Sequence, residues 1–521
     1  MAKYTLMKHQ KQAVKFLEDK RGVGALLMEP GTGKTGSTLA WLDKLADRRG
    51  EVRVLVVAPL TAADTWVLQV PLFMDSVVKA RMMQGATTKI MAQVAQARDW
   101  DNVPDTPVME DHKGEGARVL QGNKVTILSV SAGAVSSYCK NAPATVQMLR
   151  AIRKYQPHVV VVDESHIVKS ATANISTAMY QIGQLAPHRI ILTGTVAPHS
   201  PLDVYGQWRF LAPWTFSRFY GDPMTKTPDT MTVAQRRDIT PWTWKQFLGK
   251  YATQGGFKGK GIGDFINQTD LNNRVAERSL VVLKKDALDL PPTTDIDIHV
   301  TLTPKERKAY VEMASKLATE MASGELISAP NALAKIMKLR QIASGFVKDT
   351  ETGEVHVVGR SLQKAVAEVV NTQLAGENRI VVFAYFKAEC EALQKALAQK
   401  GRTVEVITGA TKPADRLAIR KRFLDVSGNP EPVVLVAQQR TMSVSVNELV
   451  SAQHAVYASM SERRDDWVQS RGRLDRQGQT APVTYWNVYV PNTVGAVMLN
   501  THKMRGDLEK GLLDHIRSYA K

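Results

Sequence analysis

Residues 29–35 read Glu-Pro-Gly-Thr-Gly-Lys-Thr, and this stretch decides the fold of the chain. An apolar run, residues 25–28, comes before it, and residues 36–45 follow with the composition of a helix. Two glycines let the backbone curl so that several N–H groups point at one phosphate, and the amino end of the helix adds a positive dipole. The stretch therefore predicts a strand, a glycine-rich turn and a helix that together bind the phosphates of a nucleoside triphosphate.

The residues of this turn have separate expected roles. The backbone cradles the phosphates, the lysine reaches the β- and γ-phosphates of ATP, and the threonine that follows it holds Mg²⁺. The strict form of the pattern has glycine at position 28, where this chain has Met28. A chance glycine turn is the alternative, and the strand and helix on its two sides argue against it. The residues predicted to bind ATP through the turn are Gly31, Thr32, Gly33, Lys34 and Thr35.

A helix is predicted ahead of the turn, because Val14 and Leu17 are apolar residues at helical spacing. Gln10 lies in this segment. Its amide both donates and accepts hydrogen bonds, as recognition of an adenine edge requires. Two interpretations of Gln10 stay open at this point, a contact with the adenine of ATP and a solvated glutamine.

Buried-strand patterns recur along the chain. Continuous apolar runs are typical of parallel strands that are covered on both faces, and helical segments between them predict an α/β fold with two doubly wound parallel-sheet lobes. The runs lie at residues 52–59, 125–130, 159–162 and 190–193, and again at 380–384, 404–408, 433–437, 455–458 and 483–488. The predicted boundaries are 1–212 for the first lobe, 213–290 for an aromatic-rich helical insertion, 291–360 for a further helical insertion with the start of the second lobe, and 361–521 for the rest of that lobe.

An acidic pair follows the third of these runs. Asp163 and Glu164 come directly after the strand predicted at residues 159–162. One carboxylate at the carboxyl end of a central strand can bind Mg²⁺ through water, and a second can orient the water that attacks the γ-phosphate. We therefore expect Asp163 to hold the metal with Thr35, and Glu164 to be the catalytic carboxylate. For His166 the alternatives are coupling of the nucleotide to neighbouring loops and capping of a helix.

The segment that follows the first lobe is rich in aromatic residues, among them Trp214, Phe216, Phe247 and Tyr251. Aromatic side chains beside lysine and arginine can stack on the bases of a nucleic acid. The other interpretation, which the composition favours, is that they form the core of a small helical insertion.

The composition indicates a partner and a compartment. The chain has 521 residues and a formal net charge of +18 that is spread along its length, which indicates a polyanionic partner with nucleic acid as the first candidate. Cys139 and Cys390 are far apart, so the sequence predicts neither a disulfide framework nor a metal cluster. No apolar run reaches the length of a membrane span. We expect a cytoplasmic protein without a membrane partner.

Four motifs in order, EPGTGKT (29–35), VVAP (56–59), DESH (163–166) and LTGT (192–195), resemble the first lobe of superfamily-two helicases. Residues 278–286, 290–292 and 302–310 resemble the segment that joins the two lobes in Swi/Snf-type DNA translocases, and the likeness continues almost to the last residue. The resemblance implies two RecA-like lobes that bind ATP between them and step along one strand of duplex DNA. It further implies remodelling of forks, branches or DNA-bound protein in replication, recombination or repair.

Residues 469–479 read Gln-Ser-Arg-Gly-Arg-Leu-Asp-Arg-Gln-Gly-Gln and carry the resemblance into the second lobe. The spacing predicts that Arg473 and Arg476 lie on one face of a helix. Arginines delivered from the second lobe would stabilise charge on the transferring phosphoryl group, so that hydrolysis depends on closure of the lobes. We also expect Gln469 to contact the nucleotide. The alternative for the two arginines is a solvated helix face.

The chain departs from the family pattern at residues 441–449. Met442, Ser443 and Ser445 stand where the family often has glycine, and their side chains hinder the close backbone approach to a DNA phosphate that glycine allows. A nucleic-acid-binding protein with a vestigial ATPase is therefore one alternative function. Another is a superfamily-two helicase that separates DNA or RNA strands outright.

Little sequence lies outside the two predicted lobes. We accordingly expect a monomer without an obligate protein partner. The minimal form suits a bacterial cell or a virus-infected bacterial host, and a eukaryotic source would place the protein in the nucleus.

Overall fold

The structure is a computed structural model in which residues 5–83, 85–99, 123–139, 142–194, 196–197, 200–217, 239–255, 261–322, 329–398, 401–424, 431–442 and 448–504 are described. The chain divides into two compact units, with the boundary between Leu288 and Asp289. Of the residues singled out in the sequence, Thr195, Ser443 and Ser445 lie outside the described ranges. In the described part, no helix is long and apolar enough to cross a membrane.

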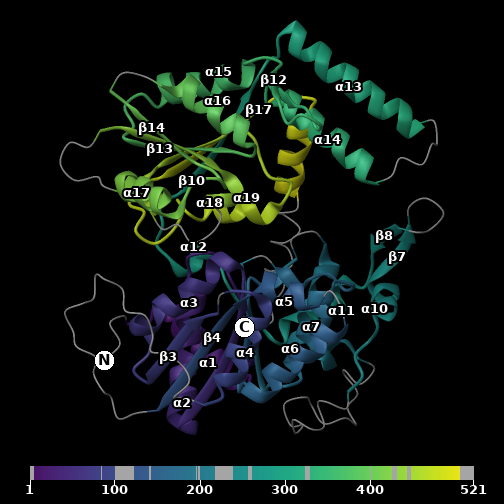
Figure 1. Ribbon diagram of the computed structural model, residues 1–521, viewed down its shortest axis with the longest axis vertical. Helices are drawn as coiled ribbons and strands as arrows, with labels where there is room; N and C mark the ends of the chain where they lie inside the picture. Colours follow the sequence, from purple (N-terminus) through teal and green to yellow (C-terminus); the bar gives the residue numbers. More distant parts are fainter. Residues whose placement is uncertain are drawn as a thin grey trace. The chain divides into compact units, whose positions relative to one another are not determined.

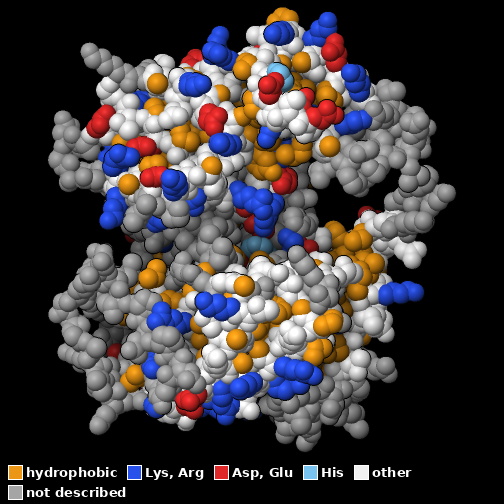
Figure 2. Space-filling view, in the orientation of Figure 1, with side chains coloured by type: hydrophobic (Ala, Val, Ile, Leu, Met, Phe, Trp, Pro, Cys, Tyr) orange, Lys and Arg blue, Asp and Glu red, His pale blue; other side chains and the backbone are white. Residues whose placement is uncertain are grey.

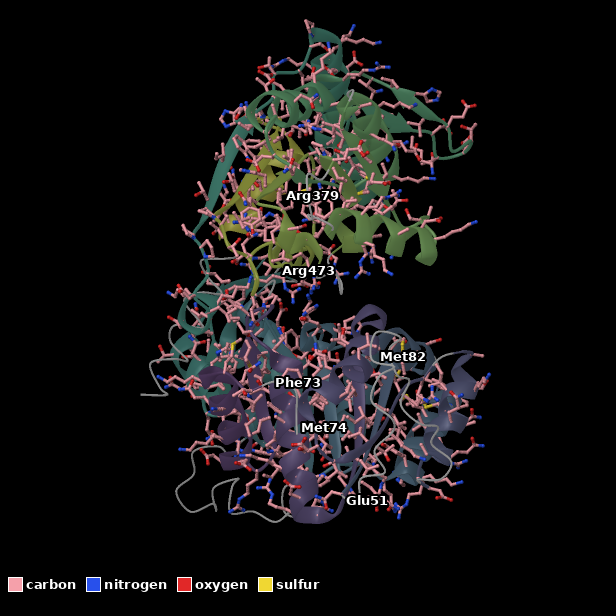
Figure 3. All side chains as sticks on the ribbon, turned by 90° about the vertical axis from the view of Figure 1, so that its left-hand side faces the viewer. Glu51, Phe73, Met74, Met82, Arg379 and Arg473 are labelled. Atoms are coloured by element: carbon pink, nitrogen blue, oxygen red, sulfur yellow. The ribbon has the colours of Figure 1, made fainter. Side chains whose placement is uncertain are left out.

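The first unit is built on a seven-stranded sheet in which every pair of neighbouring strands is parallel (Figure 1). In spatial order the strands are β3 (Val77–Met82), β4 (Lys124–Ser131), β2 (Glu51–Ala58), β5 (Val159–Asp163), β6 (His188–Thr193), β1 (Val23–Met28) and β9 (Ser279–Val282). Because the strands are parallel, their carboxyl ends share one edge. Figure 3 marks the two edges, with Glu51 at the amino end of β2 and Met82 at the carboxyl end of β3.

Both faces of this sheet are covered, which explains its continuous apolar runs. The valines of β5 divide between two cores: Val159 and Val161 pack in one, and Val160 and Val162 pack in the other. Figure 1 shows helices on the two sides of the sheet. The first core contains residues of α1 (Lys8–Asp19), α2 (Lys34–Arg49) and α3 (Leu60–Phe73), and the second contains residues of α4 (Thr87–Gln96), α5 (Ala132–Tyr138), α6 (Ala142–Tyr155), α7 (Asn174–Gly183) and α8 (Val204–Leu211).

An insertion with its own small elements follows α8. It consists of a 3₁₀ turn, η5 (Pro213–Phe216), α10 (Trp244–Tyr251), the antiparallel hairpin of β7 (Ala252–Gly255) and β8 (Gly261–Phe265), and α11 (Gln268–Ala276). The rings of Phe216, Phe247 and Tyr251 contact one another and are almost completely buried. The prediction that these aromatic residues are core residues is confirmed, but they belong to the same core as Val160 and Val162 of β5 and not to a separate core of the insertion. After the insertion the chain returns as β9 to the edge of the main sheet and continues into α12 (Lys284–Ala287).

The second unit repeats the design with a six-stranded parallel sheet. In spatial order its strands are β10 (Thr293–His299), β17 (Val483–Tyr489), β16 (His454–Tyr457), β13 (Arg379–Ala384), β15 (Val433–Gln438) and β14 (Thr403–Ile407). Its helices include α13 (Pro304–Ala322), α14 (Ala329–Ala343), α15 (Ser361–Glu368), α16 (Lys387–Leu397), α17 (Pro413–Leu424), α18 (Gln439–Met442) and α19 (Arg464–Arg471). A short hairpin, β11 (Phe346–Lys348) and β12 (Val355–Val357), follows α14.

Alternate residues of β13 again pack in separate cores, Ile380 and Val382 in one and Val381 and Phe383 in the other. The predicted α/β class, with two doubly wound parallel-sheet lobes, is confirmed. Strands β3, β9 and β10 were not among the predicted runs. Strand β10, Thr-Thr-Asp-Ile-Asp-Ile-His, is an edge strand whose residues are exposed or half-buried, so it lacks the continuous apolar pattern of the central strands.

Candidate nucleotide site and arginine motif

The glycine-rich turn connects the carboxyl end of β1 to the amino end of α2. Gly31 and Gly33 have φ angles of 89° and 87°, a left-handed conformation that favours glycine. Thr32 between them is buried, and its N–H and its hydroxyl both donate to the carbonyl of Glu29, at 3.2 and 2.8 Å respectively. Gly33 is also the residue that caps α2. The two glycines thus set the curl of the turn, as the sequence predicts.

Lys34 and Thr35 are the first residues of α2, and both are half-buried. The ammonium group of Lys34 donates to the carbonyl of Met28 at 2.9 Å, across the mouth of the turn. Its charge also lowers the pKa of Asp163, so the two side chains lie within electrostatic range. The lysine therefore lies on the same edge of the sheet as Asp163, near enough for its charge to act on that carboxyl.

Two residues of α1 lie against the turn. His9, through its Nε2, forms a hydrogen bond of 2.8 Å with the carbonyl of Thr32. The Gln10 amide packs against Gly33 so closely that a Cβ at position 33 would overlap it. Gln10 is buried, and its Oε1 accepts from the N–H of Met7 at 2.8 Å. Gln10 is therefore not a solvated surface glutamine, and its contact with adenine stays a prediction.

Asp163 is the last residue of β5, and both of its carboxylate oxygens have donors. The indole Nε1 of Trp66 donates to Oδ2 and the N–H of Glu164 donates to Oδ1, each at 2.9 Å. Burial, reinforced by the charge of Glu164, raises the pKa of Asp163 to about 6, against the lowering effects of Trp66 and Lys34. The carboxylate is held in place in a nearly dry setting, where its charge acts strongly on neighbouring groups.

Glu164 differs from its neighbour in conformation and exposure. Its backbone is left-handed, with φ 48° and ψ 57°, which is uncommon for a residue with a side chain and is a feature of functional sites. Its side chain is 20% exposed, and its Oε2 lies 3.5 Å from Nδ1 of the buried His166. The pair thus combines one buried and one partly accessible carboxylate.

The donor atoms at this edge fit Mg²⁺. The hydroxyl of Thr35 and the carboxylate of Asp163 are oxygen donors, which Mg²⁺ prefers, and Mg²⁺ is usually bound through one or two protein oxygens together with phosphate oxygens and water. The described residues contain no cluster of three or more His, Cys, Asp or Glu side chains that would hold a metal by themselves. Two protein oxygens suit a cation that takes its remaining ligands from phosphate and water.

The arginine motif lies in the second unit, and its local structure corrects the sequence prediction. Helix α19 ends at Arg471, so Gln469 lies on the helix while Arg473 and Arg476 lie in the turns that follow it. The prediction that both arginines share a helix face is wrong. The physical reason is Gly472, a poor helix former that follows the last helical residue and caps the helix. Figure 3 shows Arg473 near the periphery of the second unit.

The turn that carries these arginines is held from both sides. Arg471 forms a bidentate ion pair with Asp295 of β10, at 2.6 and 2.7 Å, and its guanidinium lies over the ring of Tyr485. At the other end of the motif, the amide of Gln479 donates to the carbonyls of Ala452 and Val450, at 2.9 and 3.2 Å. The backbone between these anchors therefore has a defined course, and it presents Arg473 and Arg476 half-buried.

His9 and Trp66 were not predicted from the sequence. Trp66 lies 97 residues from Asp163, and His9 lies 23 residues from Thr32. No local pattern connects such residues. The one available signal for Trp66 was its place in an apolar helix directly after the strand β2, which neighbours β5.

Comparisons with known proteins agree on one family. The family described as the SNF2-related domain matches residues 9–345. An uncharacterized ATP-dependent helicase of Mycoplasma genitalium, MG018, is 22% identical over 98% of this chain and 42% of its own length. The human DNA annealing helicase and endonuclease ZRANB3 is 24% identical over 73% of this chain and 31% of its own length.

Among solved structures, the SWI2/SNF2 ATPase core of Sulfolobus solfataricus in complex with dsDNA matches 98% of this chain and 93% of that chain, with 17% identity and a TM-score of 0.40. The chain spans less than half the length of the curated relatives described above.

Proposed function

The chain belongs to the family of SNF2-related domains, the Swi/Snf-type ATPases of helicase superfamily two, and from this premise we propose that it uses ATP hydrolysis to translocate along duplex DNA. The observation that supports the chemical step best is the acidic pair, because a buried, hydrogen-bonded Asp163 and a partly exposed Glu164 stand at the same sheet edge as Lys34. Phosphoryl transfer needs positioning and charge stabilisation at such an edge more than it needs covalent chemistry.

The roles follow from these positions. The N–H groups of the turn at residues 31–33 hold the phosphates, and Lys34 exchanges the carbonyl of Met28 for the β- and γ-phosphates. Thr35 and Asp163 hold Mg²⁺, which neutralises phosphate charge when it is bound. Glu164 orients the attacking water.

The remaining predicted contacts bring in α1 and the second unit. Gln10 contacts the adenine, and Gln469 contacts the nucleotide from the second lobe. Arg473 and Arg476 stabilise the charge on the transferring phosphoryl group when the lobes close, so that turnover depends on closure.

DNA is the proposed partner because the charge of the chain suits a polyanion. The net charge is +18, and Figure 2 shows lysine and arginine side chains spread over the visible surface of both units. Duplex DNA is the polymer named with the Sulfolobus structure, and DNA annealing is named for ZRANB3. We assign this chain the same class of substrate, duplex or branched DNA, and remodelling of forks, branches or DNA-bound protein in replication, recombination or repair as the outcome of translocation.

The test is the steady-state ATPase rate without nucleic acid and with single-stranded DNA, duplex DNA, branched DNA and duplex RNA. We expect duplex or branched DNA to stimulate the rate most, and Lys34→Ala to abolish the stimulated rate. Stimulation by RNA alone would favour an RNA helicase. A rate equal to that of Lys34→Ala under every condition would favour a binding protein with a vestigial ATPase.

A second variant tests the catalytic carboxylate. Glu164→Gln keeps the shape of the side chain but cannot orient water as a carboxylate does, so we expect it to bind ATP with the wild-type dissociation constant and to lose turnover by a factor of about 10² or more. Binding of a fluorescent ATP analogue and the ATPase rate measure the two properties separately. Wild-type turnover in this variant would refute the role of Glu164.

A further inference from the structure

A buried glutamine lies next to the acidic pair and has no part in the proposed chemistry. Gln207, on α8, has no exposed surface, and neither has Ser165, the residue after Glu164. The hydroxyl of Ser165 donates to Oε1 of Gln207 at 2.6 Å. The amide nitrogen of Gln207 donates to the carbonyls of Val196 and Asp203, at 2.7 and 3.0 Å. One side chain therefore bonds to three separate points of the chain.

Two of these points belong to segments that follow neighbouring strands. Ser165 begins the 3₁₀ turn η3 (Ser165–Val168) after β5, and Val196 lies in the segment after β6. Both segments leave the carboxyl edge of the sheet, where the glycine-rich turn also lies. Gln207 thus ties the acidic segment to the segment beside it, within the first unit.

Close packing of α8 brings Gln207 to this place. The neighbouring residue, Gly206, approaches η3 so closely that a Cβ there would overlap the carbonyl oxygen of Val168. The backbone of α8 therefore lies directly on the backbone of η3. This close approach brings the side chain of Gln207 within hydrogen-bond distance of Ser165. The contact is a built feature of the fold, because glycine is the residue that permits it.

From this geometry we propose that Gln207 is a positioning residue for ATP hydrolysis, which holds Ser165, and through it the backbone of Glu164, at a fixed place relative to the segment after β6. The proposal rests on the role given to Glu164 under the proposed function. Glu164 has a left-handed backbone, which persists only when its surroundings hold it. The hydrogen bond from the Ser165 hydroxyl to Gln207 holds the residue that directly follows Glu164.

The amide is the group that this position requires. Gln207 accepts one hydrogen bond through its oxygen and donates two through its nitrogen, so a neutral amide satisfies all three partners. A leucine satisfies none of them. A glutamate keeps the acceptor for the Ser165 hydroxyl, but it places an oxygen where the amide nitrogen faces the carbonyls of Val196 and Asp203. The Gln207→Glu variant therefore keeps the accepted hydrogen bond and removes the two donated ones.

The test compares Gln207→Leu, Gln207→Glu and Ser165→Ala with the wild-type chain. A misplacement of about 1 Å at a reacting group costs ~10²-fold in rate. We expect each variant to lower kcat for ATP at saturating duplex DNA by at least about tenfold, with KM for ATP changed by less than about twofold. If Gln207 served only to stabilise the fold, its variants would lower the melting temperature but would not lower kcat while leaving KM for ATP unchanged.

A matched control is available on the same helix. Tyr205→Phe removes a partly buried hydrogen bond of 2.8 Å from the Tyr205 hydroxyl to the carbonyl of Trp242, on the side of α8 that faces the insertion. We expect this variant to keep the wild-type kcat within about twofold. An equal loss of kcat in Tyr205→Phe would show that any weakening of α8 has the same effect and would overturn the proposal.

A second readout does not depend on turnover. Hydrogen exchange without nucleotide should become faster in peptides covering residues 163–168 and 194–197 in Gln207→Glu, and stay unchanged there in Tyr205→Phe. Unchanged exchange together with unchanged kcat in Gln207→Glu and Ser165→Ala refutes the positioning role, even if Gln207→Leu does not fold. Failure of the proposed function is recognised separately, by a Glu164→Gln variant that still hydrolyses ATP.

Discussion

At the scale of single residues, burial and the charge of Glu164 raise the pKa of Asp163, and its hydrogen-bond donors partly offset them. The free-enzyme pKa of about 6 means that kcat/KM for ATP should fall as the pH drops through about 6, because the protonated carboxyl no longer holds the metal. The indole of Trp66 lowers this pKa, so Trp66→Phe should move the acid limb of the profile to higher pH and lower kcat/KM at pH 7 by about two- to tenfold.

Trp41→Phe is the matched control for that measurement. Trp41 is as deeply buried as Trp66, but its Nε1 meets no acceptor among the described residues. The control should therefore leave the pH profile in place. If both variants shift the profile equally, loss of packing and not loss of the indole donor is the cause.

The ion pair between Asp295 and Arg471 makes a second prediction at this scale. Burial alone would raise the pKa of Asp295, but hydrogen bonds and charge from Arg471, with a hydrogen bond from Asn487, outweigh it and hold the pKa below its usual range. The stabilisation is therefore present above the unfolded pKa of about 4 and disappears as the pH falls through the folded pKa.

Asp295→Asn should accordingly destabilise the second unit at pH 7 by about 1–2 kcal/mol, less than a fully buried pair would lose because Asp295 is 37% exposed. Urea unfolding of the wild type and the variant measures the difference. This difference in unfolding free energy between wild type and variant should shrink in acid, between pH 4 and pH 3. A difference that is the same at pH 7 and pH 3 would contradict the assignment of the ion pair.

The residues of the site were predictable where the chemistry is local in sequence. Gly31, Gly33 and Lys34 belong to one short turn, so their positions follow from their order along the chain. Gln207 and Trp66 act through contacts that span 42 and 97 residues, and such contacts depend on which strands become neighbours. A single sequence does not contain that information in any local pattern.

At the scale of elements, replacing each of two helical glycines by alanine should change the stability of the first unit in opposite directions. Gly206 in α8 has no room for a Cβ, whereas Gly249 in α10 has open space around it. Gly206→Ala should destabilise the first unit by about 3 kcal/mol through overpacking, and Gly249→Ala should stabilise it by about 0.5–1 kcal/mol because alanine has the higher helix propensity. Thermal unfolding of both variants checks the signs. A stabilising Gly206→Ala would show that α8 and η3 are not in backbone contact.

Central strands were predictable and edge strands were not. Strand β5 is buried on both faces and consists of four valines before Asp163, so its pattern is unmistakable. Strand β10 is an edge strand with alternating half-buried residues, and charged residues such as Asp295 on it resemble a loop. The end of α19 was missed for a different reason: the i, i+3 spacing of Arg473 and Arg476 fits a helix, but Gly472 stops the helix before them.

At the scale of the whole molecule, the net charge of +18 predicts how DNA binding responds to salt. Each phosphate contact releases a counterion, so six contacts weaken binding by about 10³-fold between 50 and 200 mM salt. The duplex concentration that half-saturates the ATPase should rise steeply over this range. The DNA-free rate is the internal control and should change by less than about twofold. A half-saturating concentration independent of salt would contradict phosphate recognition.

The position of β1 in its sheet has a consequence for synthesis of the chain. Both neighbours of β1 come from far downstream, since β6 begins at His188 and β9 at Ser279. At roughly 5–20 residues per second, a ribosome needs about 8–30 s after finishing β1 to reach β6. Through this interval an entirely apolar strand has both edges open, which is the condition for mispairing with other nascent chains. The strand that precedes the glycine-rich turn is thus made before the other strands of its sheet and waits longest for its first neighbour.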